Sequence, residues 1–283
     1  MAGRVQTGTT GNDSIFGGLG EDTLYGGLFL LSPQDGNDSV HGGDRNDLIY
    51  GNGGIDWIQG DDASDTLYGG EGDDLIFGGG PFFRLGDGAD ALYGGQGSDT
   101  LYGGNGNDTL IGGTATTDPL DAADILLGGM GDDVIYGNGG DDIVDGENGN
   151  DTIYGGAGNN ILRGGAGSDE IYSISDGDII EGGDGIDRYY IFDASGARVA
   201  AFGPLQPSAP RIRGFEAGET IAIISSASND LQTRNNGEDT QIILNGRVIA
   251  ILEDVATDRL DANTMTNVVV FEAPPKNTTP PPP

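Results

Sequence analysis

A nine-residue repeat limits what this chain can fold into. Residues 94–102 and 103–111 read GGQGSDTLY and GGNGNDTLI, two consecutive copies of the pattern Gly-Gly-x-Gly-x-Asp-x-U-x, in which U is apolar. Eighteen such units run from residue 8 to residue 190 if three of them each carry seven extra residues. A short fixed period of this kind is typical of a solenoid, in which each repeat stacks on its neighbours.

The eighth position of each unit supplies the expected core. One apolar residue in nine, flanked by polar turns, indicates a strand of about three residues with one inward side chain. Two such strands make one turn of a flattened parallel coil. The predicted core residues are Ile15, Leu24, Val40, Ile49, Ile58, Leu67, Ile76, Leu92, Leu101, Leu110, Leu126, Ile135, Val144, Ile153, Leu162, Ile171, Ile180 and Tyr189.

The sixth position supplies the candidate metal ligands. It is Asp in seventeen units and Asn160 in one, always after a glycine-rich turn. Glycine permits left-handed backbone and brings carbonyl groups close together, and Ca²⁺ prefers carbonyl and carboxylate oxygens. The candidate calcium ligands are Asp13, Asp22, Asp38, Asp47, Asp56, Asp65, Asp74, Asp90, Asp99, Asp108, Asp124, Asp133, Asp142, Asp151, Asp169, Asp178 and Asp187.

At these glycine and aspartate positions the chain resembles the RTX (repeat-in-toxin) family of calcium-binding nonapeptide repeats. The resemblance implies an all-β, right-handed parallel β-roll with Ca²⁺ between the turns of units n and n+2. It would pair Asp99 with Asp124, and Asp108 with Asp133. Because each site lies between two successive turns on the same side, eighteen turns on two sides give at most about 16 sites. Three departures lower the expected number to roughly 10 to 14: Arg45 replaces a glycine, Asn160 lacks the charge, and residues 173–178 lack the glycine pair.

The charge of the chain indicates why a cation is needed. The net charge is −34, and residues 8–190 hold 35 acidic and 4 basic residues. A disordered acidic tail is the simpler interpretation of such charge, but it would not space carboxylates nine residues apart around an aliphatic residue. With so small a core and so many repelling carboxylates, we expect the repeat region to be unfolded without metal and to fold on binding it.

Composition also excludes several classes of partner and site. There is no cysteine, which excludes disulfides and thiolate metal sites. No stretch approaches the roughly 20 apolar residues of a membrane span, and the N-terminus lacks the apolar run of a Sec signal peptide. So acidic a chain should be repelled by nucleic acid and anionic lipid.

The insertions and the ends divide the chain further. Insertions at 28–35, 80–87 and 114–121 are expected to be bulged surface loops on the turn edges. Apolar residues in two of them either form a partner-binding patch or fold back over the solenoid: Leu28, Phe29, Leu30, Leu31, Phe82 and Phe83. Residues 1–7 are a short lead, too short for a capping or catalytic domain.

Residues 191–272 alternate in polarity and predict a β-rich cap, with a hairpin turn at Asn245–Gly246. The resemblance implies that a type I secretion signal lies in or after this region. Residues 273–283 form a proline-rich tail, expected to be disordered, and they leave the position of such a signal open.

The ninth position carries tyrosine in most even-numbered units, which predicts a ladder up one face. The ladder either stabilises the sheet or binds carbohydrate or another surface. On the opposite face, an isoleucine row is expected to pack against the C-terminal segment: Ile125, Ile143, Ile161 and Ile179.

No residue pattern indicates catalysis. His41 is the single histidine, expected to be exposed at a ninth position, and neither a phosphate loop nor a zinc cluster is present. We therefore expect a non-enzyme: a secreted, calcium-loaded β-roll with an extracellular or cell-surface structural or adhesive role, open to self-association or to cell-surface polysaccharide. One alternative is a folding, secretion or targeting module of an RTX toxin, protease or polysaccharide-modifying enzyme. A second is ice binding, although Thr occupies the second repeat position only at Thr9.

Overall fold

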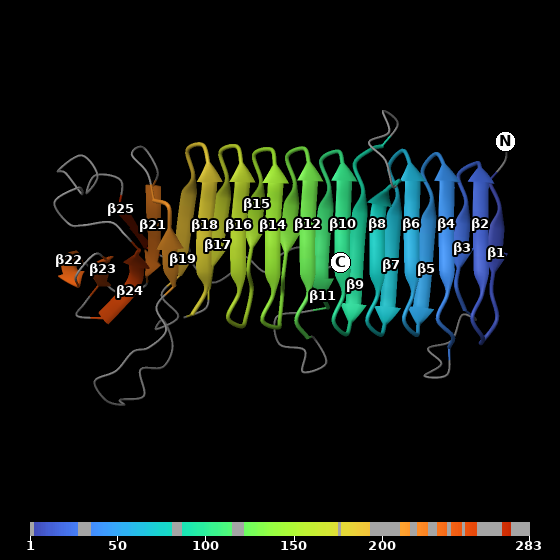
Figure 1. The fold of residues 1–283 in the computed structure, drawn as a ribbon, viewed down its shortest axis with the longest axis horizontal. Coiled ribbons are helices and arrows are strands. Elements are labelled where there is room, and N and C mark those ends of the chain that lie inside the picture. Colours follow the sequence, from blue (N-terminus) through green and yellow to red (C-terminus); the bar gives the residue numbers. More distant parts are fainter. Residues whose placement is uncertain are drawn as a thin grey trace.

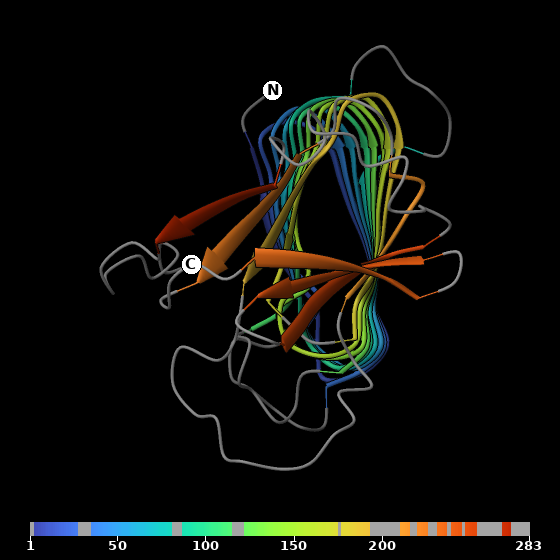
Figure 2. The ribbon, with the colours of Figure 1, turned by 90° about the vertical axis from the view of Figure 1, so that its left-hand side faces the viewer.

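The computed structural model describes residues 3–27, 35–80, 87–114, 122–174, 177–192, 210–215, 220–225, 231–236, 239–244, 247–253 and 268–272. The chain winds as a flattened coil in which successive strands alternate between two sheets (Figure 1). Viewed along the coil, the two sheets face each other, with the connecting turns along both edges (Figure 2). No helix in the described residues could cross a membrane.

Sheet A is 12-stranded and takes every second strand of the repeat region. In spatial order its strands are β1 Val5–Thr7, β3 Thr23–Tyr25, β5 Leu48–Gly53, β7 Thr66–Glu71, β9 Ala91–Gln96, β11 Thr109–Gly113, β13 Val134–Tyr136, β15 Thr152–Tyr154, β17 Glu170–Ser173, β19 Arg188–Phe192, β21 Thr220–Ser225 and β25 Val268–Glu272.

Sheet B is 13-stranded and takes the strands between them. In spatial order its strands are β2 Ser14–Leu19, β4 Ser39–Asp44, β6 Trp57–Asp62, β8 Leu75–Gly79, β10 Thr100–Asn105, β12 Ile125–Met130, β14 Ile143–Asn148, β16 Ile161–Ala166, β18 Ile179–Asp184, β20 Arg211–Arg213, β24 Arg247–Leu252, β23 Asp239–Leu244 and β22 Leu231–Asn236.

Pairing in both sheets is parallel and in register throughout the repeats. Leu101 of β10, for example, lies opposite Ile76 of β8 on one side and Leu126 of β12 on the other. All eighteen predicted core residues are buried, and only Ile15 at the open end retains measurable exposure, 7%. The parallel β-roll fold and its core are therefore confirmed.

The described strands of the C-terminal segment lengthen the coil. Strand β20 pairs in parallel with β18, β21 with β19, and β24 and β25 add one further strand to each sheet. Strands β22, β23 and β24 form an antiparallel meander at the end of sheet B. Residues 245–246, the predicted hairpin turn, lie outside the described residues between the paired strands β23 and β24.

This end-on arrangement corrects one expectation. Ile125 and Ile143 of the isoleucine row are 40% and 37% exposed, so the described C-terminal strands do not cover them. The physical reason is that its strands satisfy their backbone hydrogen bonds on the edges of β18 and β19, beyond the row rather than above it.

The predicted tyrosine ladder runs up the outer face of sheet A. Ring centroids of consecutive tyrosines lie 4.3–5.1 Å apart with nearly parallel planes. Its members are Tyr25, Tyr50, Tyr68 and Tyr93, then Tyr136, Tyr154, Tyr172 and Tyr190, with Ile111 between the two runs. Stacked identical side chains hold the sheet flat.

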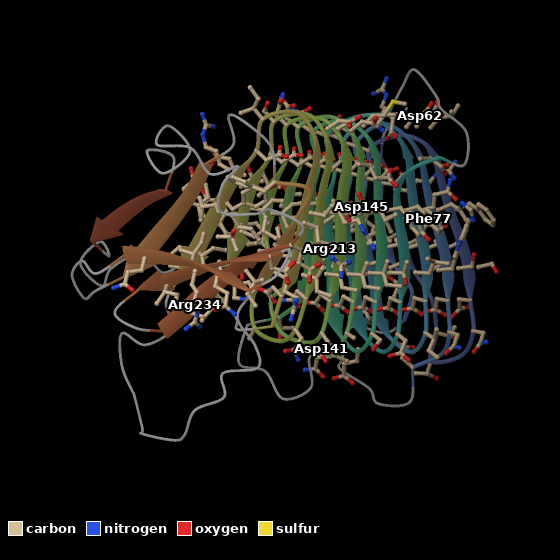
Figure 3. All side chains as sticks on the ribbon, turned by 60° about the vertical axis from the view of Figure 1, so that its left-hand side comes forward. Asp62, Phe77, Asp141, Asp145, Arg213 and Arg234 are labelled. Atoms are coloured by element: carbon tan, nitrogen blue, oxygen red, sulfur yellow. The ribbon has the colours of Figure 1, made fainter. Side chains whose placement is uncertain are left out.

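The outer face of sheet B is aromatic at one end and charged at the other. Phe77 stacks on Tyr102 at 4.8 Å, whereas farther along Arg163 lies between Asp145 and Glu181, with nitrogen–oxygen distances of 3.8 and 4.0 Å. Phe77, Asp145 and Arg213 follow this face in Figure 3.

His41 is half-buried rather than exposed. Its ring stacks on Phe16 at 4.8 Å and meets the edge of Trp57 at 4.5 Å. Burial lowers the pKa of His41, although Asp61 opposes the shift. The prediction that His41 is exposed was wrong because Trp57, which covers its ring, belongs to the neighbouring strand β6 and not to the same repeat unit.

Several expectations lie outside the described residues. The apolar insertion residues Leu28, Phe29, Leu30, Leu31, Phe82 and Phe83 are among them, as is the tail 273–283.

Candidate metal centres

Two positions in each glycine turn require left-handed backbone. The second and fourth residues of the regular units have positive φ, such as Gly129 at +112° and Gly131 at +130°. Arg45 occupies the fourth position of its unit with φ of 75°, so the turn keeps its shape where glycine is replaced. These turns form two columns along opposite edges of the roll, with Asp62 at one edge and Asp141 at the other (Figure 3).

The sixth-position side chains follow these two edges. The Asp13 column contains Asp13, Asp38, Asp56, Asp74, Asp99, Asp124, Asp142, Asn160 and Asp178. The Asp22 column contains Asp22, Asp47, Asp65, Asp90, Asp108, Asp133, Asp151, Asp169 and Asp187. Sixteen of the seventeen predicted aspartates are buried, and Asp13 at the open end is half-buried.

From Asp38 onward, one oxygen of each carboxylate holds neighbouring turns together. Oδ1 accepts a hydrogen bond from the backbone N–H of the sixth residue two units earlier in the chain. Asp99 donates to Asp124 at 2.8 Å and Asp108 donates to Asp133 at 2.7 Å. The structure thus places these aspartates as neighbours, in the pairs that the resemblance implies.

The other oxygen, Oδ2, is directed into the turn. It is buried without a hydrogen-bond partner in the described residues at Asp22, Asp38, Asp47, Asp56, Asp65, Asp74, Asp90, Asp108, Asp133, Asp151, Asp169 and Asp187. An orphaned carboxylate oxygen in the interior is costly unless a cation or proton compensates its charge.

The first glycine of the regular units makes room for this oxygen. A Cβ atom on Gly128 would lie 2.4 Å from Oδ2 of Asp133 and 2.7 Å from the carbonyl oxygen of Gly146, in the next turn of the same column. Gly103 stands in the same relation to Asp108 and to the carbonyl of Gly128. A carboxylate and a carbonyl oxygen therefore converge at the regular turns, whereas at Gly182 the hydroxyl of Tyr189 lies where the other turns have the carbonyl.

This donor set fits Ca²⁺. Calcium takes six to eight oxygen ligands, commonly from carboxylates and backbone carbonyls, with flexible geometry. No three His, Cys, Asp or Glu side chains gather into a metal cluster in the described part of the chain. Backbone carbonyls must therefore complete the coordination.

Burial makes the columns unfavourable for uncompensated charge. It raises the pKa of Asp65 and Asp133 to about 8, and of Asp74 and Asp90 to about 9, against the opposing effect of the backbone hydrogen bonds that these carboxylates accept. Neighbouring aspartates of the same column add to the rise. These four carboxylates thus require either a proton or a cation.

Three positions of the Asp13 column differ. Thr9 donates its backbone N–H and its hydroxyl to Oδ2 of Asp13, at 2.6 and 2.9 Å. Asn160 directs a buried amide nitrogen where the other units have Oδ2. Ser173 donates its hydroxyl to Oδ2 of Asp178 at 2.5 Å.

Two insertions contribute carboxylates that the sequence analysis did not propose as ligands. Oδ2 of Asp35 lies against Gly27, and Oδ2 of Asp87 lies against Gly79 and accepts the N–H of Asn105 at 2.9 Å. Both residues end an insertion and precede the fourth-position glycine of the unit, which is the signal that could have identified them. Asp121, in the same place of the third insertion, lies outside the described residues.

A parallel β-roll with two columns of buried carboxylates beside converging carbonyls defines a multi-site calcium-binding solenoid. A family model of the RTX calcium-binding nonapeptide repeat matches residues 7–29, 34–54, 50–80, 85–115, 120–153, 145–173 and 154–189. These matches cover more than half of the chain, so the protein belongs to the RTX calcium-binding nonapeptide repeat family.

Comparison with solved structures finds the crystal structure of extracellular lipase LipA from Serratia marcescens. The similarity has 14% sequence identity and a TM-score of 0.29, and it covers 88% of this chain and 40% of the lipase chain. No curated protein matches the chain.

Proposed function

We propose that this protein is a secreted β-roll that folds when it binds multiple Ca²⁺ outside the cell and then acts as an extracellular or cell-surface structural or adhesive element. The observation that carries the proposal is the pair of carboxylate columns, in which most Oδ2 atoms are buried and have no hydrogen-bond partner within the described part of the chain. About 10 to 14 Ca²⁺ would supply 20 to 28 positive charges at these columns. This positive charge is comparable to the net negative charge of the repeat region, which has 35 acidic and 4 basic residues.

The outer face of sheet A supports a role in assembly or adhesion. From β3 to β15 its seventh and ninth repeat positions hold no Asp, Glu, Lys, Arg or His, in a chain with a net charge of −34. The seventh positions are Thr23, Leu48, Thr66, Ala91, Thr109, Val134 and Thr152, beside the tyrosine ladder. A flat, uncharged, regular face suits association with another flat surface once calcium has neutralised the edges.

The edges of the stacked tyrosines, rather than their ring faces, point outward, because the neighbouring rings cover the faces. A sugar ring therefore cannot stack on a ring face within the ladder. Among the proposed partners, this favours self-association or a broad surface contact over the binding of single sugar units.

The test is a Ca²⁺ titration of the whole chain, followed by far-UV circular dichroism and light scattering, with Mg²⁺ in parallel. Mg²⁺ demands near-ideal octahedral geometry and retains its water, so it should not replace Ca²⁺. We expect a cooperative rise of β signal with Ca²⁺ only. A simultaneous rise in scattering supports an assembling surface protein, and a folded spectrum in excess chelator contradicts calcium-dependent folding.

The second candidate is a non-catalytic folding, secretion or targeting module of a larger RTX protein, exported by a type I machinery. The roll is extended by strands β20, β21, β24 and β25. Such strands can cap a solenoid both in a separate protein and in a module of a larger one. A reading frame that joins this sequence to a catalytic or pore-forming domain would favour the module. Neither candidate includes catalysis by this chain.

A further inference from the structure

The two carboxylate columns end differently. In the Asp22 column the last two carboxylates, Asp169 and Asp187, keep Oδ2 buried and without a hydrogen-bond partner in the described residues. In the Asp13 column the last two positions are Asn160 and Asp178, and each departs from the repeating geometry. The two columns belong to the same roll, so the difference comes from these side chains.

Ser173 occupies the first repeat position, where every other unit has glycine. At the matching position of the Asp22 column, a Cβ on Gly164 would lie 2.2 Å from Oδ2 of Asp169 and 2.4 Å from the carbonyl oxygen of Gly182. Ser173 places a CH₂OH group at this position of its own unit. Its hydroxyl donates to Oδ2 of Asp178 at 2.5 Å. A protein hydroxyl thus satisfies the oxygen that would otherwise face a cation.

Asn160 replaces an acceptor with a donor one turn earlier. Its Oδ1 accepts a hydrogen bond from the backbone N–H of Asp142 at 2.9 Å. Asn160 therefore still connects two neighbouring turns, as the aspartates do. Its Nδ2 is buried, has no hydrogen-bond partner among the residues that the structure describes, and would lie 3.1 Å from a Cβ on Gly155. An amide N–H₂ has no lone pair for a cation, and its partial positive charge repels one.

The opposite end of this column is closed in a similar way. Oδ2 of Asp13 accepts both the backbone N–H and the hydroxyl of Thr9. At Asp13 and Asp178, Oδ2 therefore accepts hydrogen bonds from the protein itself. At Asn160 an amide nitrogen stands in place of Oδ2. All three positions belong to the Asp13 column.

We propose that donors of the chain itself replace calcium at both ends of the Asp13 column, so that this column binds ions only between the turns of Asp38 and Asp142. The Asp22 column binds them over its full length to Asp187. The protein thus holds two calcium columns of unequal length. The inference rests on the calcium-dependent function proposed above and adds the distribution of the ions along the two edges.

The experiment counts bound Ca²⁺ by native mass spectrometry of the full chain at saturating Ca²⁺. Asn160→Asp restores a carboxylate, and the double variant N160D/S173G also restores the open glycine position. We expect at least one ion more than in the wild-type protein, in the single or the double variant. The matched control is Asp169→Asn, the same exchange reversed in the neighbouring unit of the Asp22 column, which should lose one ion.

The outcomes separate this proposal from the general function. If the wild-type protein binds no Ca²⁺, the proposed function fails. If it binds Ca²⁺ but neither the N160D nor the double variant gains an ion, while circular dichroism shows them folded, the proposal of unequal columns is overturned. An unchanged ion count in D169N would overturn it as well, because Oδ2 would then not decide occupancy.

Discussion

The backbone N–H of Asp108 donates a hydrogen bond of 2.7 Å to Oδ1 of Asp133, which lies 25 residues further along the chain. This bond fixes the Asp133 side chain and leaves its Oδ2 buried at the turn, without a hydrogen-bond partner in the described residues. The same side chain therefore connects two turns and presents a charge that needs compensation. This double role leads to the first three predictions below.

Replacing Asp133 by Asn should keep the connecting hydrogen bond and remove the cation ligand. We expect D133N to lower the stability of the calcium-loaded roll by about 1–3 kcal/mol, the usual cost of an unsatisfied buried polar group. The Ca²⁺ midpoint of folding should rise. The control is Asp132→Asn, which removes an equal charge from the exposed neighbouring residue. Equal effects of the two variants in a calcium titration would show that only net charge matters.

Adding one methyl group to Gly128 should disturb a metal centre without changing any charge. The new Cβ would lie 2.4 Å from Oδ2 of Asp133 and 2.7 Å from a backbone carbonyl oxygen. We expect Gly128→Ala to cost about 1–3 kcal/mol, as overpacking does in a close-packed interior. Met130→Ala, in the same turn but at an exposed position, should change the thermal midpoint little. A G128A protein as stable as M130A would contradict the crowded geometry.

Acid should partly replace calcium. Burial raises the pKa of Asp74 and Asp90 to about 9, and of Asp65 and Asp133 to about 8, above the unfolded value of 3.8. A raised pKa in the folded state means that the protonated form is favoured on folding. The associated stability is complete below about pH 4 and is lost as pH rises through 8 to 9.

In chelator, the β signal in circular dichroism should therefore increase as the pH falls from 9 toward 4. In calcium the trend should reverse, because binding must release these protons. A β signal in chelator that is independent of pH over this range would show that the carboxylates do not limit folding.

Completing the tyrosine ladder should stabilise the roll. Ile111 separates the runs that end at Tyr93 and begin at Tyr136, so Ile111→Tyr would create two new ring pairs. Each aromatic pair contributes about 0.5–1.5 kcal/mol, and we expect the thermal midpoint in calcium to rise by several degrees. Ile111→Leu, which adds no ring, is the control. A fall in the midpoint for I111Y would show that the ladder is interrupted there for a packing reason.

The sequence predicted most of the roll because its determinants are local and periodic. Leu101 and its counterparts recur at a fixed place in a nine-residue unit, so the core could be read without knowing which strand pairs with which. The tyrosine ladder followed from the same spacing. The pairing of Asp108 with Asp133 came from the resemblance to the RTX repeat, with the insertion at 114–121 set aside.

The sequence did not predict features that depend on contacts between turns. Nothing in the unit distinguishes Oδ1 of Asp133, which accepts a backbone hydrogen bond, from Oδ2, which does not. Asp35 and Asp87 lie beside the glycine turns because of the place where the insertion before each of them ends. The environment of His41 depends on Trp57, a residue of another unit.

By itself, then, the sequence determined a parallel β-roll with one buried side chain per nine residues, and aspartates placed for calcium, because each choice is made within a single unit and repeated. Only the tertiary structure decided how the roll ends. Beyond residue 190 no period remains, and the free backbone edges of β18 and β19 select β20 and β21 as partners. At Asp178 the hydroxyl of Ser173, five residues earlier in the chain, donates to Oδ2, which has no hydrogen-bond partner among the described residues at Asp169. Such outcomes arise from hydrogen-bonding groups that meet only after the chain has coiled.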